Sequence, residues 1–191
     1  MTDAHPALSG DLGDMETRDG RVVLTFTRRL SHRPEKVWRG LTEPENVAAW
    51  FPTTIDGDSV AGAPLTFRFR DMQLPPMDGE MLAFEPPSLL ELLWGDELLR
   101  FELVPDGEGT VLTFTCTFDE IGRAARDGAG WHTCLDQLDC ALADTPAAWS
   151  EPDRWRQLHE VYKARFGPAA STLGPPPEWE EAHGPVATPD A

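Results

Sequence analysis

The stretch GWHTCLDQLDC, residues 130–140, decides the fold of this chain, and it admits three interpretations: a metal site, a thiol site or an amphipathic helix. At 100° per residue, Trp131, Leu135 and Leu138 fall within an arc of about 60°. A narrow apolar stripe of this kind is typical of a helix that packs one face against a neighbouring layer. We therefore predict a helix over residues 130–143 with this stripe facing the core, preceded by a loop of small residues at 119–129.

The two cysteines of this stretch do not form a common site. On a helix, Cys134 and Cys140 lie about 120° apart around the axis and about 9 Å apart along it. This separation is too large for a disulfide and for two ligands of one metal ion. We interpret Cys134 as a small buried hydrophobe, and we expect neither a metal nor a cofactor.

His132 and Asp136 are four residues apart, so their side chains lie within reach of each other on one helix face. The interpretation that we favour is an ion pair on the wet side of the helix or at the rim of a sheet. Two alternatives stay open: an acid–base pair in which His132 transfers protons, and the beginning of a metal site whose third ligand comes from elsewhere. We assign no catalytic residue and keep His132 and Asp136 as candidates.

Upstream of this helix, residues 53–118 consist of short apolar segments separated by turn signals. The segment TVLTFTCTF, residues 110–118, alternates apolar side chains with threonines, and PLTFRFR, residues 64–70, alternates in the same way. A period of two predicts strands with one buried face and one wet face. Short joins such as PDGEG, residues 105–109, predict an antiparallel meander.

The remaining segments give the domain organisation. RVVLTFTRRLSH, residues 21–32, predicts a strand, and Pro34 and Pro44 each open a short helix after it. The spacing of apolar residues at 151–167 predicts a further helix. We divide the chain into a flexible arm at 1–20, a domain at 21–145, an added helix at 146–167 and a Pro-rich acidic tail at 168–191. The fold class is α+β.

Four motifs between residues 22 and 142 resemble a known family: RPEKVWRGLTEPENVAAWFP, GEMLAFEPPSLLELLWG, VPDGEGTVLTFTCTF and GWHTCLDQLDCAL. In order and spacing they are similar to the activator of Hsp90 ATPase homologue-like (AHSA1-like) proteins of the START/Bet v 1-like superfamily, also called SRPBCC. The resemblance implies a helix-grip fold, in which a curved antiparallel sheet wraps around the 130–143 helix and encloses a mostly apolar cavity. The superfamily includes lipid and hormone binders, cyclases and a co-chaperone module, so the fold does not select one function.

Apolar residues on segments expected to face the interior form the predicted lining of this cavity. They are Trp50, Phe51, Phe67, Phe69, Phe84, Trp94, Phe101, Phe114, Trp131, Leu135 and Leu138. We predict a protein that binds a small apolar or amphipathic molecule between the sheet and the helix, rather than an enzyme. Two alternatives are a cyclase- or hydrolase-like enzyme that uses His132, and a protein-interaction module, co-chaperone-like or regulator-linked, that binds a protein partner or a second copy of the chain.

The charge of the chain argues against two classes of partner. A formal net charge of −17 disfavours binding to nucleic acid and to anionic membrane surfaces. No run reaches the ~18 apolar residues of a membrane span. The first 20 residues lack the basic and apolar regions of a signal peptide, and three cysteines give no disulfide framework. We therefore expect a cytoplasmic protein that binds neither nucleic acid nor membranes.

Overall fold

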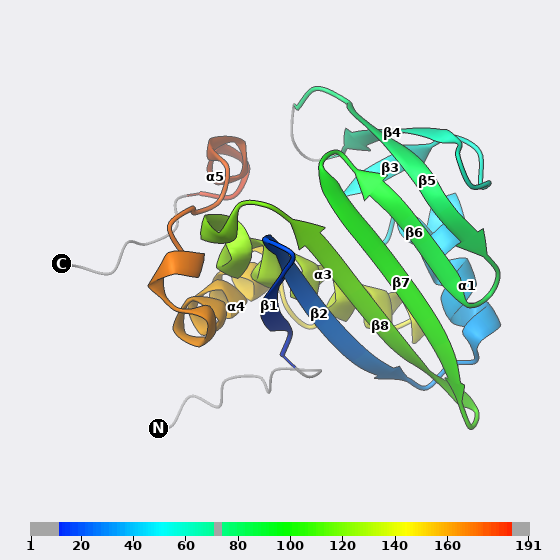
Figure 1. Cartoon of the computed structure of the whole chain (residues 1–191). Coiled ribbons are helices and arrows are strands. Elements are labelled where there is room, and N and C mark those ends of the chain that lie inside the picture. Colours follow the sequence, from blue (N-terminus) through cyan, green and yellow to red (C-terminus); the bar gives the residue numbers. More distant parts are fainter. Residues whose placement is uncertain (1–11, 71–73, 185–191) are drawn as a thin grey trace, which may run out of the picture.

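The computed structural model describes residues 12–70 and 74–184. Eight strands form one antiparallel sheet in the order β1-β2-β8-β7-β6-β5-β4-β3 (Figure 1). The strands are β1 (Asp14–Arg18), β2 (Arg21–Leu30), β3 (Thr53–Asp56), β4 (Pro64–Phe69), β5 (Met77–Glu85), β6 (Leu89–Trp94), β7 (Glu97–Asp106) and β8 (Gly109–Phe118). The helices are α1 (Pro34–Thr42), α2 (Pro44–Val47), α3 (Ala124–Leu142), α4 (Glu151–Phe166) and α5 (Pro177–His183), with short turns of 3-10 helix, η1 (Ile121–Arg123) and η2 (Pro168–Ala170).

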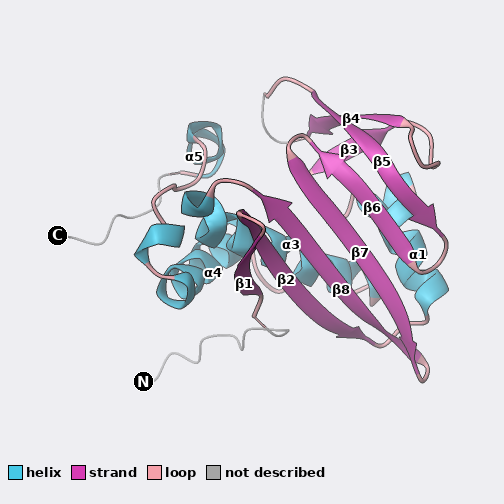
Figure 2. Cartoon of the chain, viewed as in Figure 1, coloured by secondary structure: helices cyan, strands magenta, loops and turns pink. Residues whose placement is uncertain are grey.

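Alternation along the strands creates the two faces of the sheet. In β8, Leu112, Phe114 and Cys116 are buried, whereas the threonines between them are partly exposed, as the period of two predicts. β7 pairs with β8 through a two-residue loop between Asp106 and Gly109. Gly107 in this loop has a φ of 61°, the left-handed conformation that such hairpin turns favour. α1 and α3 lie on the same face of the curved sheet (Figure 2), so the predicted α+β helix-grip fold is confirmed.

Helix α3 begins at Ala124, six residues before the predicted start at 130. The prediction of a small-residue loop at 119–129 is therefore wrong for its second half. The physical reason is the close approach of α4: a Cβ on Gly128 would lie 3.2–3.3 Å from the rings of Phe166 and Tyr162. Small residues at this point allow two helices to pack closely, and sequence periodicity does not separate that role from a loop.

Three elements lie in segments where no regular structure was predicted. β1 falls within the predicted arm and pairs with β2, with Met15 opposite Leu24. β3 pairs with β4 at the other edge of the sheet. In the predicted tail, α5 packs against α4 through Trp179, whose ring centre lies 4.7 Å from that of Trp155. β1 forms a hairpin with β2 through the turn at Asp19 and Gly20, whereas α5 depends on a partner more than 20 residues away.

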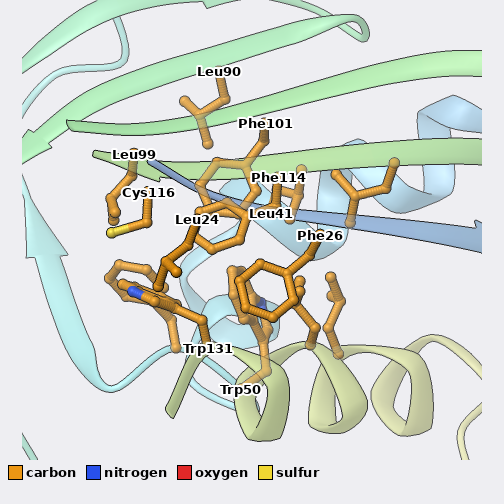
Figure 3. Close-up of a cluster of buried hydrophobic side chains, with 14 of the residues drawn as sticks. Leu24, Phe26, Leu41, Trp50, Leu90, Leu99, Phe101, Phe114, Cys116 and Trp131 are labelled. Carbon is orange, nitrogen blue, oxygen red and sulfur yellow. The ribbon is translucent and has the colours of Figure 1, made fainter. Parts of the chain in front are cut away.

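The space between the central strands and α3 is filled by aromatic side chains. The rings of Phe101 and Phe114 stack with their centres 4.5 Å apart, and the centre of the Trp131 ring lies 5.0 Å from that of Phe114. Figure 3 shows the side chains of the sheet and Trp131 meeting between the two layers. Centre-to-centre distances of about 4.5–7 Å are those of closely packed aromatic rings, so this region is a solid core.

Candidate functional site

The predicted cavity-lining residues divide into two groups in the structure. Six of them line none of the three pockets described below and belong to the packed core or its border: Phe67, Trp94, Phe101, Phe114, Trp131 and Leu135. The other five reach a pocket, but not the same one: Trp50, Phe51, Phe69, Phe84 and Leu138. The structure therefore does not bring the predicted lining together around one space.

The largest of these pockets, which we call the main pocket, has a volume of about 350 Å³. It lies where α1 and α2 face strands β3–β6. Its apolar lining comes from both layers: Leu41, Val47, Leu65, Met81, Phe84, Leu90 and Leu92. Its polar lining is small: Thr42, Thr53, Thr54, Asp56 and Ser59. A mostly apolar pocket of this size with a few polar groups is typical of small-molecule sites.

The polar groups of the main pocket differ in what they already bind. The hydroxyl of Thr42 donates to the carbonyl oxygen of Trp38 at 2.8 Å. The carboxylate of Asp56 accepts a hydrogen bond from the guanidinium of Arg68. Thr53 is 1% exposed, and its hydroxyl oxygen accepts a hydrogen bond of 3.2 Å from Nε1 of Trp94. Trp94 thus contributes to the main pocket by orienting a lining residue.

Two smaller pockets lie elsewhere on the molecule. The first, of about 270 Å³, lies between α1 and α3 and has the charged side chains of Lys36, Arg39 and Glu43 in its lining. The second, of about 240 Å³, lies where the segment around Phe51 meets α3, α4 and α5, and its lining includes Cys134. Both are smaller than the main pocket, and polar atoms form a larger part of their surface.

His132 and Asp136 are buried, so the prediction that they lie on the wet side of the helix is wrong. His132 is 0% exposed and Asp136 is 5% exposed. Nδ1 of His132 lies 2.8 Å from the hydroxyl of Tyr162, and its Nε2 lies 3.4 Å from Oδ1 of Asp136. Tyr162 belongs to α4, which covers this face of α3. The apolar spacing of 151–167 predicts an added helix, but it does not indicate the surface on which that helix packs.

Asp136 lies between two arginines. Its Oδ2 accepts hydrogen bonds from Nε and Nη2 of Arg154 at 3.0 and 2.6 Å. Its Oδ1 lies 3.8 Å from Nη2 of Arg28. Because these side chains come from β2, α3 and α4, the cluster joins three elements, and among the pockets described above none is lined by His132 or Asp136.

A second buried cluster, at the start of β7, was missed. Glu97 is 7% exposed, accepts a hydrogen bond from Sγ of Cys116 at 3.1 Å and pairs with Arg123. Burial, reinforced by the charge of Asp127, raises the pKa of Glu97 from 4.5 to about 7. The signal was available, since Glu97 alternates with Leu99 and Phe101 on the inward face of β7.

The cysteines are not activated nucleophiles. Burial, with the charge of Glu97, raises the pKa of Cys116 well above its usual value. Burial also raises the pKa of Cys134, which is partly exposed and packs against the core, close to the predicted role of a small hydrophobe. A thiol with a raised pKa is a poor nucleophile at neutral pH. In the described part of the chain, no group of three or more His, Cys, Asp or Glu side chains is placed to bind a metal.

Comparison with known proteins places the fold in a family. The family model of "Activator of Hsp90 ATPase homolog 1-like protein" matches residues 31–143. This chain belongs to that family, and the predicted family resemblance is confirmed. The match covers the segment from the end of β2 to the end of α3, and it leaves α4 and α5 outside. A search of curated proteins gives no match.

Solved structures with the same fold cover most of the chain. A conserved protein of unknown function from Enterococcus faecalis, EF2215, is 21% identical, covers 81% of this chain and 90% of its own, and has a TM-score of 0.68. CalU16 from Micromonospora echinospora is 21% identical over 80% of this chain and 94% of its own, with a TM-score of 0.63. The BPP1335 protein of Bordetella parapertussis is 24% identical over 86% and 95%, with a TM-score of 0.65. These likenesses establish the fold.

None of the helices in residues 12–70 and 74–184 is both long and apolar enough to cross a membrane.

Proposed function

We propose that this protein binds a small apolar or amphipathic molecule in the main pocket. The observation that carries the proposal is the pocket itself, about 350 Å³ of space with a mostly apolar lining from α1, α2 and strands β4–β6. Small-molecule sites typically occupy about 300–1,000 Å³, so the pocket is of suitable size for a compact ligand. Burying the apolar part of a ligand contributes roughly 25 cal/mol per Å² of surface removed from water.

The proposed site differs in place from the predicted one. We expected the ligand between the sheet and the 130–143 helix, but aromatic rings fill that region. The space that can receive a ligand lies under α1 and α2 instead, and of the predicted lining residues Phe84 faces it.

The alternatives have less support. As an acid–base group, His132 would need access to a substrate, yet its ring is fully buried against Tyr162. A protein-binding surface would favour a contiguous apolar patch. Of the large apolar side chains exposed in the described part of the chain, Val60 and Val104 lie on separate segments. Ile121 and Leu173 lie close together, because the N–H of Leu173 donates to the carbonyl oxygen of Gly122, and they form a patch of two side chains. A protein partner, a homodimer and a cytoplasmic location stay predictions.

Phenylnaphthylamine, a neutral probe that fluoresces in apolar sites, tests the proposal. We expect saturable binding to the full chain, and we expect Val47→Phe to weaken it at least about tenfold because the added ring occupies the main pocket. Ala141→Phe is the matched control, since Ala141 is exposed and lines the pocket between α1 and α3. Melting temperatures check that both variants fold. A probe that does not bind the wild-type chain, or that binds both variants equally, contradicts the proposal.

A further inference from the structure

We propose that the main pocket selects uncharged molecules that present a carbonyl or similar acceptor oxygen to the hydroxyl of Thr53, and that it rejects organic anions. This inference rests on the proposed function, because it specifies the chemical class of the ligand for the same pocket. It is carried by two observations: the hydrogen bonds of the lining hydroxyls, and the placement of charge around the pocket.

Thr53 lines the pocket, and its hydroxyl retains a hydrogen-bond donor. The indole Nε1–H of Trp94 can donate a hydrogen bond but cannot accept one. The contact of 3.2 Å therefore uses a lone pair of the Thr53 oxygen, and the hydroxyl proton of Thr53 can still be donated to another group. Within residues 12–70 and 74–184, no group accepts that proton. Thr53 is almost fully buried and lines the pocket. A buried donor is satisfied when a ligand places an acceptor within reach.

The other lining hydroxyls are placed differently. The Thr42 proton is donated to the carbonyl oxygen of Trp38, so it is not available to a ligand. Thr54 and Ser59 are exposed, at the opening of the pocket, where water competes for their hydrogen bonds. Thr53 is therefore the hydroxyl that combines a free proton with burial, and this combination makes a hydrogen bond selective.

Charge around the pocket disfavours anions. In the described part of the chain its lining contains no lysine or arginine, and its one charged residue is Asp56. The nearby cation, Arg68, is engaged by the Asp56 carboxylate. An anion that enters such a pocket loses hydration without gaining a counter-charge. The net charge of −17 also repels anions at longer range.

Three fluorescent naphthalene probes of similar body separate these features. Prodan is a neutral ketone, phenylnaphthylamine is neutral without a carbonyl, and anilinonaphthalene sulfonate is an anion. We expect the wild-type chain to bind both neutral probes and to bind the sulfonate at least about tenfold more weakly. The emission of Prodan moves to longer wavelength when its carbonyl accepts a hydrogen bond, so bound Prodan also reports the contact itself.

Two variants test the role of Thr53. Thr53→Val retains the shape of the side chain and removes the hydroxyl, so we expect it to weaken Prodan binding about three- to tenfold and to leave phenylnaphthylamine binding unchanged. Thr53→Ser retains the hydroxyl and should retain Prodan binding. Melting temperatures establish that each variant is folded. If Thr53→Val does not fold, the preference of the wild-type chain for neutral probes and the Prodan emission still decide the matter.

The outcomes distinguish the two proposals. If neither neutral probe binds the wild-type chain, the proposed function fails and the inference fails with it. If both neutral probes bind, but the sulfonate binds as tightly and Thr53→Val has no selective effect on Prodan, the pocket is a binding site and the inference is overturned.

Discussion

Asp136 joins three elements through its two carboxylate oxygens, and one of them is α4. One oxygen binds Arg154 of α4, and the other faces His132 and Arg28. A buried charge with its partners removed is strongly unfavourable, because neither water nor a counter-ion replaces them. The cluster therefore specifies how β2, α3 and α4 meet.

Asp136→Ala is expected to lower the free energy of unfolding by about 3–5 kcal/mol, because it leaves buried arginine charge without its carboxylate partner. Asp139→Ala is the matched control, since Asp139 lies one turn along the same helix and is exposed. For that variant we expect a change of no more than about 0.5 kcal/mol. Urea denaturation followed by circular dichroism measures both. Equal effects of the two substitutions would show that the cluster does not stabilise the fold.

Glu97 makes the stability of the protein depend on pH. Its carboxyl faces Arg123 and Asp127 at the start of α3, Cys116 on β8 and Asp96 in the preceding turn. Because burial raises its pKa in the folded state from 4.5 to about 7, the folded chain retains a proton that the unfolded chain releases between these pH values. The contribution of Glu97 to the free energy of unfolding is therefore fully present below pH 4.5, and it is lost as the pH rises towards 7.

Glu97→Gln is expected to reduce this loss, since glutamine resembles the protonated carboxyl at every pH. Between about pH 4.5 and 8, we expect the free energy of unfolding of the wild-type chain to fall by roughly 1–3 kcal/mol more than that of the variant. Urea midpoints measured across this range give the comparison. The exposed Glu45→Gln serves as control and should follow the wild-type curve. Parallel curves for Glu97→Gln and the wild type would rule out this role.

At the scale of elements, α4 belongs to the folded core although the family match ends at residue 143. Its side chain Tyr162 accepts a hydrogen bond of 2.8 Å from the backbone N–H of Gly13 and contacts His132 at the same distance. Arg154 binds Asp136. The helix thus connects the start of β1 to α3, and it closes the face of α3 that the sheet leaves open.

A chain that ends at residue 145 is therefore expected to lose cooperative unfolding, because it exposes His132 and leaves Asp136 without Arg154. A chain that ends at residue 174 is the control: it retains α4 and removes α5, whose Trp179 packs on Trp155. We expect the control to melt cooperatively. Thermal melting followed by circular dichroism compares the two with the full chain. A cooperative melt of the 145-residue chain near that of the full chain would contradict a core role for α4.

At the scale of the whole molecule, the sheet encloses two volumes of different character. The space against α3 is filled by rings such as Phe114 and Trp131. The space against α1 and α2 is lined by smaller side chains, among them Val47 and Leu65, and it stays open. One curved sheet thus supports both a solid core and a pocket. The side chains that strands and helices together contribute to each space decide which of the two forms.

The sequence by itself determined the class of fold and the inward faces of its main elements. The alternation in 110–118 and the stripe of Trp131, Leu135 and Leu138 are local patterns, and each requires a buried face on its own segment. The short turn at 107–108 then requires the strands on either side to be antiparallel neighbours. Local chemistry is sufficient for these features because residues close in sequence produce them.

The tertiary structure alone decided which faces are covered and where space remains. His132 and Asp136 lie on a face of α3 away from its apolar stripe, which predicts that they are exposed to solvent. They are buried because α4 packs on that face. The pocket lies against α1 and α2, and not against α3 as predicted. The volume of a cavity is the space under the curved sheet that the side chains of several elements leave unfilled. Neither coverage nor residual volume is a property of one segment, so no local pattern in the sequence encodes it.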